Sequence, residues 1–302
     1  MPSWKQVLDQ AKAAGSTHDI LRRRFLRQLH NRTGRNVIVY YSGWLQKPEM
    51  TRKGVLGFEV NDADKNAFMA TIHKMDRSKG LDLILHTPGG EVAATESLVD
   101  YLRSMFPHDI RAIIPQIAMS AGTMMALACK AVMMGKHSSL GPIDPQIRGI
   151  PAHGIIEEFK QAASDIAASP AMIPVWQPII AKYHPTLIGE CQKAIDWSTK
   201  MVRDWLVTGM FKGESDGPKK ADRIIKELGD HALTKSHSRH ISCATARSLG
   251  IKVEDMEMDQ KIQDAILSVH HASIQSLGAT SAIKLIENQL GVAYVQHVKM
   301  DE

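Results

Sequence analysis

The chain has 302 residues, 44% of them hydrophobic and 23% charged, which allows a sizeable core in one large domain or two small ones. The net charge of +5 is spread along the chain and aromatic residues make up only 5%, so we do not expect a nucleic-acid partner. Three widely spaced cysteines without a CxxC pair indicate a reducing compartment and no disulfide framework.

The first 35 residues predict a helical segment. Residues 4–32 have the pattern of two helices with polar faces, and the second carries an arginine-rich stretch at 22–28. No apolar stretch typical of a signal peptide occurs at the N-terminus. We therefore expect a cytoplasmic protein, which could still associate peripherally with a membrane through the arginine-rich stretch.

From residue 36 the sequence alternates between strand and helix patterns. Apolar, β-branched and aromatic runs predict four strands, at 36–44, 81–87, 110–116 and 131–135. Helical spacing predicts helices beginning near Asn61, Glu91 and Ser120. This alternation predicts an α/β fold with a mostly parallel sheet, in which ligands bind beyond the carboxyl ends of the strands.

The uncharged run 112–129 could be mistaken for a membrane-spanning helix. A span needs about 20 predominantly apolar residues, and Pro115, Gln116 and Ser120 interrupt this run. We expect a buried strand followed by a buried helix, and no transmembrane segment.

The rest of the chain has mostly helical patterns. Helices are expected at 154–167, 174–183, 185–210, 221–229 and 258–290. Between the last two, the stretch 234–252 is polar and rich in histidine.

Ser120 is the strongest candidate for a nucleophile. It begins a predicted helix, where free backbone N–H groups and the helix dipole favour developing negative charge. Pro88-Gly89-Gly90 follows the preceding strand, so the turn and the serine can reach one crevice. The backbone N–H groups of Gly89, Gly90 and Ala121 are candidates for an oxyanion hole. Taken singly, a serine at a helix start is usually a cap and Pro-Gly-Gly usually a turn.

Three segments, LHTPGGEV, IPQIAMSAGTMMALAC and SSLGPIDPQI, together resemble the Clp/crotonase superfamily. The likeness is greatest to its signal peptide peptidase A and serine dehydrogenase proteinase branch, and it is strongest over 81–147. It implies a ββα-superhelix fold with a helical extension, peptidase chemistry at Ser120 and self-assembly into rings. On this basis we expect an N-terminal helical segment (1–35), a Clp-like catalytic core (36–170), and a helical extension with the C-terminal part of the domain (171–302).

The base that activates Ser120 is less evident. Clp proteases have a histidine about two dozen residues after the serine, but Asp144 stands at that position here. Signal peptide peptidases use a lysine further on, which makes Lys160 the candidate for a Ser-Lys dyad. Lys160 lies at the edge of the apolar arc of its helix, where partial desolvation would lower its pKa. His137 is the alternative base, and Lys182 is a weaker alternative lysine.

Other polar residues could line the site. His86 ends a strand beside the glycine turn, although it has the pattern of a core histidine, and Asp144 and His137 are further candidates. His237 and His240 have a spacing compatible with metal binding, but no carboxylate-rich pattern accompanies them, so we expect no metal. We also expect no cofactor, because the proposed chemistry needs none and no phosphate-binding loop motif is present.

The substrate is expected to be a peptide or an unfolded protein. Two alternatives remain open at the level of sequence. A crotonase-like enzyme acting on acyl-thioesters would use the same oxyanion geometry without a covalent serine. A non-catalytic ring that binds peptides would keep the fold with a degenerate site.

Overall fold

The computed structural model describes residues 18–229 and 236–298. The second of the two predicted N-terminal helices is present as α2 (His18–Thr33). The first one falls almost entirely within 1–17 and lies outside the described residues.

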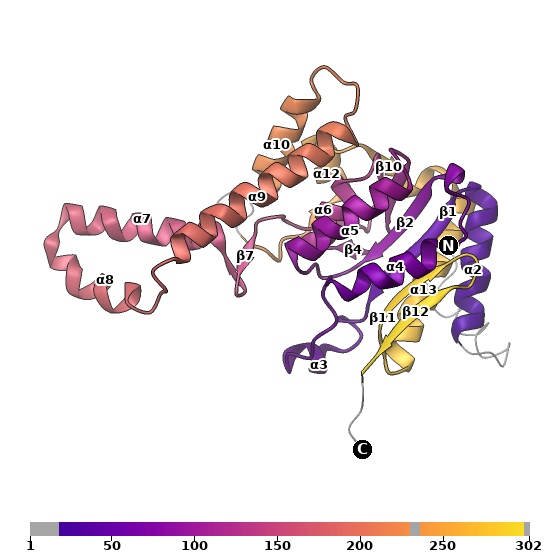
Figure 1. Cartoon of the computed structure of the whole chain (residues 1–302), viewed down its shortest axis with the longest axis horizontal. Coiled ribbons are helices and arrows are strands. Elements are labelled where there is room, and N and C mark those ends of the chain that lie inside the picture. Colours follow the sequence, from indigo (N-terminus) through magenta and orange to yellow (C-terminus); the bar gives the residue numbers. More distant parts are fainter. Residues whose placement is uncertain (1–17, 230–235, 299–302) are drawn as a thin grey trace.

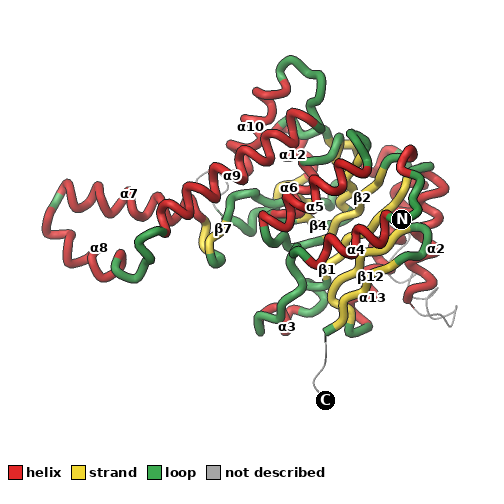
Figure 2. Tube along the Cα trace, in the orientation of Figure 1, coloured by secondary structure: helices red, strands yellow, loops and turns green. Residues whose placement is uncertain are grey.

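A seven-stranded sheet with the order β10-β5-β3-β2-β1-β11-β12 forms the centre of the molecule (Figures 1 and 2). Its first five strands pair in parallel, while β11 pairs antiparallel with both β1 and β12. The strand bounds are β1 (Asn36–Ser42), β2 (Leu81–His86), β3 (Ile110–Ile114), β5 (Ala131–Met134), β10 (Val253–Asp255), β11 (Ala282–Asn288) and β12 (Ala293–His297). The four strands predicted between residues 36 and 135 are confirmed, and so is the mostly parallel α/β fold.

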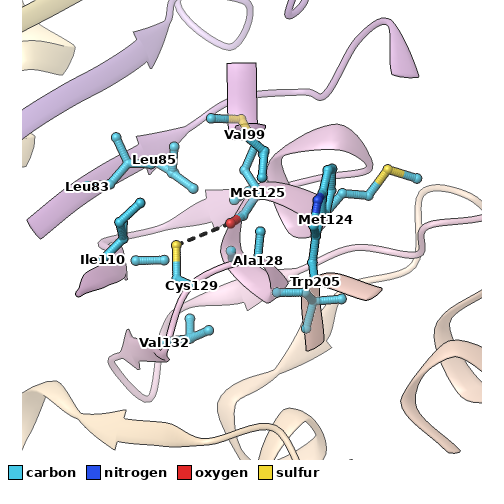
Figure 3. Packing of buried hydrophobic residues seen from close by; sticks show 14 of the residues in the cluster. Leu83, Leu85, Val99, Ile110, Met124, Met125, Ala128, Cys129, Val132 and Trp205 are labelled. Atoms are coloured by element: carbon cyan, nitrogen blue, oxygen red, sulfur yellow. Dashed lines mark hydrogen bonds between the residues drawn. The ribbon is translucent and has the colours of Figure 1, made fainter. Parts of the chain in front are cut away.

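Helices cover both faces of this sheet and create two apolar clusters. The first face carries α4 (Ala63–Ile72), α5 (Val92–Met105) and α6 (Ala121–Leu127), backed by α9 (Leu187–Thr208), α10 (Gly217–Gly229) and α12 (Cys243–Leu249). The second face carries α2 and α13 (Gln260–Ala279). Figure 3 shows part of the first cluster, where Leu83 and Leu85 of β2 lie near Met125 of α6 and the Cys129 thiol donates to the Met125 carbonyl (3.2 Å). The uncharged run 112–129 is thus a buried strand and a buried helix, as predicted.

Smaller elements complete the region beyond the carboxyl ends of the parallel strands. A three-stranded sheet contains β4 (Ile117–Ala118), β6 (Ser139–Leu140) and β9 (Ile241–Ser242), and a hairpin contains β7 (Gln146–Ile147) and β8 (Ile150–Pro151). A five-residue helix, α3 (Pro48–Arg52), and three short 3-10 turns, at Arg77–Lys79, Pro170–Met172 and Met256–Met258, lie in the connections.

An arm projects from this body (Figure 1). It consists of α7 (Ala152–Ala168), α8 (Ile173–Ile180) and the first turns of α9, held together by a small cluster that includes Ile155 and Cys191. The structure thus has a helical extension, although α7 lies within the range predicted for the core, 36–170.

The prediction of a helix throughout 258–290 is wrong at its end. The helix α13 stops at Ala279, and residues from Ala282 form the buried strand β11. The strand pattern is hidden because Lys284, Glu287 and Asn288 are charged or polar residues that lie fully buried in the strand.

The proposed division at residues 35 and 170 stays a prediction. Strands β10, β11 and β12 from the last segment belong to the same sheet as β1–β3, so that sheet draws on both of the larger predicted segments. Among the described residues, no helix is long and apolar enough to cross a membrane.

Candidate active site

Ser120 occupies a sharp turn between β4 and α6. It precedes the first residue of α6 and has φ 49° and ψ −116°, a backbone conformation that is rare for any residue other than glycine. Such a conformation costs about 1–3 kcal/mol and persists where the surrounding structure enforces it, which is common at active sites. A strained strand-to-helix turn is also how α/β hydrolases present a nucleophilic serine.

The glycine turn packs directly against this serine. Gly89 has φ 104°, and a Cβ added to it would lie 2.6 Å from the Ser120 Cβ and 3.1 Å from the Ala121 nitrogen. The two loops are also joined through Thr87, because the Met119 N–H donates to the Thr87 carbonyl (3.0 Å). The structure therefore brings Ser120, Gly89 and Ala121 together, although the turn and the serine lie in separate strand–helix connections.

Two backbone donors remain available beside the serine. In the described part of the chain, the N–H groups of Gly90 and Ala121 donate no hydrogen bond to another residue. The Gly89 N–H instead donates to the Thr87 side-chain oxygen (3.2 Å). Gly90 and Ala121 are consequently better placed than Gly89 to supply an oxyanion hole.

Ser120 opens into a cavity of about 450 Å³. Its walls include Gly89, Gly90 and Met124, together with the carboxylate-bearing residues Glu59 and Glu91. The remaining lining residues are Pro88, Val92, Pro145, Gln146 and His237. A cavity of this size can hold several residues' worth of side chain and backbone from an extended ligand.

Among the described residues that line this cavity, His237 is the histidine. Its Nδ1 lies 2.9 Å from Oδ1 of Asp144, whose side chain is completely buried, while 22% of the His237 side chain is exposed. Because a carboxylate only accepts hydrogen bonds, Nδ1 carries the proton and Nε2 is the nitrogen able to accept one. A buried carboxylate that fixes the tautomer of a histidine is one part of a Ser-His-Asp triad, and this histidine lines the same cavity as Ser120.

The structure does not bring Lys160 to Ser120. Lys160 is exposed on α7, within the projecting arm, and it is absent from the residues that line the serine cavity. Lys182 also belongs to the arm, where it lines a separate cavity with Tyr183 and Glu190.

Two further histidines considered from the sequence, His86 and His137, do not line the serine cavity either. His86 is fully buried between Trp44, Tyr41 and His270, and neither of its ring nitrogens has a hydrogen-bond partner among the described residues. His137 is exposed and lines a neighbouring cavity of about 420 Å³, which shares His237 and Pro88 with the serine cavity.

Sequence reasoning did not consider His237 as a candidate base. It considered His237 and His240 only as metal ligands. The signal that could have identified His237 is the aspartate at 144, which takes the place of the Clp histidine and needs a partner. Within residues 18–229 and 236–298, no group of three or more His, Cys, Asp or Glu side chains could hold a metal ion.

A mostly parallel sheet with a serine on a strained turn beside a glycine turn is the architecture of a ClpP-like serine proteinase. The chain belongs to the family of ClpP-like SDH-type serine proteinases, whose model matches residues 10–286. The resemblance to the serine dehydrogenase proteinase branch, inferred from three short segments, is thereby confirmed.

Two archaeal relatives cover most of the chain. The uncharacterized protein MJ0137 of Methanocaldococcus jannaschii is 29% identical over 239 residues, which is 78% of this chain and 74% of the relative. The uncharacterized protein MJ1495 of the same organism is 26% identical over 235 residues, covering 77% and 71%. No solved structure matches the chain.

Proposed function

We propose that this protein hydrolyses peptide bonds with Ser120 as nucleophile, His237 as general base and Asp144 as the residue that orients the imidazole. The observation that carries the proposal is the 2.9 Å contact between His237 Nδ1 and Asp144, made by a histidine that lines the same cavity as Ser120. This arrangement favours His237 over Lys160, which lies exposed on the arm.

Each step assigns a proton to a named atom. The Ser120 hydroxyl oxygen attacks the scissile carbonyl carbon while its proton moves to Nε2 of His237. The carbonyl oxygen becomes negative and accepts hydrogen bonds from the N–H groups of Gly90 and Ala121. The C–N bond then breaks, and the leaving amine takes the proton from His237. Water then attacks the acyl carbon while one of its protons moves to Nε2 of His237, and the ester C–O bond breaks as that proton passes to the Ser120 oxygen.

Kinetics of matched variants test this assignment. On a fluorogenic peptide library, His237→Ala and Asp144→Asn should lower kcat by roughly 10⁴-fold, because the base is lost or held in the wrong tautomer. His240→Ala, which changes an exposed histidine three positions along, and Lys160→Ala should leave kcat unchanged.

Two results would contradict the assignment. Activity that survives in His237→Ala but disappears in Lys160→Ala would restore the Ser-Lys dyad. Wild-type protein that cleaves no peptide would favour an acyl-thioester enzyme or a non-catalytic peptide-binding protein.

We further infer that copies of the chain assemble into a homo-oligomeric ring. Support comes from the likeness to ring-forming peptidases and from the apolar tip of the arm, where Ile173, Val175 and Ile179 of α8 are exposed. Light scattering of the 33.4 kDa chain should give a multiple of that mass, and Val175→Asp should reduce it. A monomeric wild type would contradict the inference.

A further inference from the structure

A buried ion pair lies behind the glycine turn. Lys284 of β11 and Asp64 of α4 are 0% and 1% exposed, and the Lys284 ammonium donates to both Asp64 carboxylate oxygens at 2.8 and 3.0 Å. The Tyr40 hydroxyl (2.7 Å) and the Asn61 N–H (3.1 Å) donate to the same carboxylate. Taking two charges out of water usually offsets most of their attraction, so stability alone is a weak reason for this pair.

The Lys284 ammonium makes one more hydrogen bond, to a residue that lines the serine cavity. Lys284 donates to the backbone carbonyl of Glu59 at 2.8 Å. The next residue, Val60, pairs with the glycine turn on both sides of Gly90. Its N–H donates to the Gly89 carbonyl (2.8 Å), and its carbonyl accepts from the Glu91 N–H (2.9 Å).

Val60 and Gly90 are in such close contact that the position of one determines that of the other. A Cβ added to Gly90 would lie 2.2 Å from the Val60 nitrogen and 2.3 Å from its oxygen. A shift of the Glu59–Val60 segment therefore moves the Gly90 N–H, and a misplacement of about 1 Å at a reacting group can cost on the order of 100-fold in rate.

We propose that the Lys284–Asp64 pair is a positioning device that holds the Glu59–Val60 segment, and through it the Gly90 N–H, in the geometry needed to bind the oxyanion. The functional half of this inference rests on the proposed peptidase activity. Lys284 acts through the backbone and not on the substrate, because it is fully buried and does not line the serine cavity.

The same strand supplies a matched control. Glu287 of β11 lies on the opposite face from Lys284 and pairs with Arg22 of α2 at 2.8 Å, with side chains 1% and 2% exposed. Arg22 also donates to Ser276 of α13. This second pair is likewise a buried carboxylate bound to a basic side chain, but its contacts lie on the α2–α13 face of the sheet.

The experiment compares Lys284→Met and the charge-balanced Lys284→Met/Asp64→Asn with the control Arg22→Met/Glu287→Gln. In both Lys284 variants we expect kcat for peptide cleavage to fall by about 10- to 100-fold with little change in KM, because oxyanion stabilisation acts in the transition state. The control should keep its kcat even where its melting temperature falls as far. Equal kcat in all variants, or equal losses in the control, would overturn the proposal.

Amide hydrogen exchange tests the positioning of the Glu59–Val60 segment without a measurement of peptidase activity. In folded Lys284 variants, the amides of Val60 and Glu91 should exchange at least about tenfold faster than in wild type and in the control. In the wild type itself, those two amides should exchange as slowly as the amides of β11. Fast exchange there would overturn the proposal even if the variants fail to fold, and a wild type without peptidase activity would remove only the proposed function.

Discussion

At the scale of single residues, Gly90 is a position at which the structure leaves no space for a side chain. Its Cα lies against the Val60 backbone, so a methyl group there has no flexible neighbour to displace. Overpacking of this kind costs about 1–3 kcal/mol. We expect Gly90→Ala to lower both the free energy of unfolding and kcat, which denaturant titration and peptide kinetics would measure.

Gly189 provides the control for that substitution. It lies in the first turn of α9, and a Cβ added to it would meet nothing within 4 Å. Gly189→Ala should therefore keep kcat and stabilise the protein by up to about 1 kcal/mol. A Gly90→Ala variant that behaves like Gly189→Ala would show that the turn is not tightly held.

The region around Ser120 was predictable from the sequence because it depends on short motifs that directly follow predicted strands. Ser120 and the glycine turn each follow a strand of a parallel sheet, and such strand ends meet at one edge. The proposed base, His237, was not predictable in the same way. Asp144 and His237 are separated by more than 90 positions, and their pairing depends on how the last third of the chain returns to the sheet.

At the scale of elements, the contact between β2 and α13 contains an unusual group of buried histidines. Burial lowers the pKa of His86 to about 3 and lowers that of His270 well below its usual value, with repulsion from neighbouring histidines as a smaller cause. Burial also lowers the pKa of His271. These side chains are therefore neutral in the folded protein at neutral pH.

This group predicts a loss of stability on acidification. Below about pH 6.5 the unfolded chain binds protons that these histidines exclude in the folded protein, and His86 excludes its proton until the pH approaches about 3. In that window His86 lowers the free energy of unfolding by up to about 1.4 kcal/mol per pH unit. Denaturant titrations at several pH values between 7 and 4 should show the decline, with a shallower slope in His86→Phe than in wild type. The exposed His73→Gln is the control, and identical slopes in all three proteins would contradict the prediction.

Strand β11 explains why part of the fold was not predictable. In the sequence, its three buried polar residues have the pattern of a solvent-exposed helix face. In the structure, each forms a hydrogen bond with a residue that is distant in the sequence. Lys284 bonds to Asp64, Glu287 to Arg22, and Asn288 to the Thr71 carbonyl. Hydrophobic periodicity depends only on the order of apolar and polar residues along the chain. It therefore cannot identify a buried strand whose polar side chains bind partners elsewhere in the fold.

At the scale of the whole molecule, four segments spread over half of the chain converge on one cavity. The glycine turn, the serine turn and the His237 segment line it, and the buried Asp144 side chain accepts a hydrogen bond from His237. The arm of α7 and α8 projects from the body of the molecule (Figure 1), and no residue of these two helices lines the cavity.

Site-mapped labelling with a fluorophosphonate tests this convergence most directly, since the probe reacts only with a serine whose proton can be removed and whose oxyanion is stabilised. We predict a single covalent adduct on Ser120 of the wild type, none on Ser120→Ala, and strongly slowed labelling of His237→Ala, while Lys160→Ala labels at the wild-type rate. An adduct elsewhere, or a Ser120 that labels equally well without His237, would contradict the account.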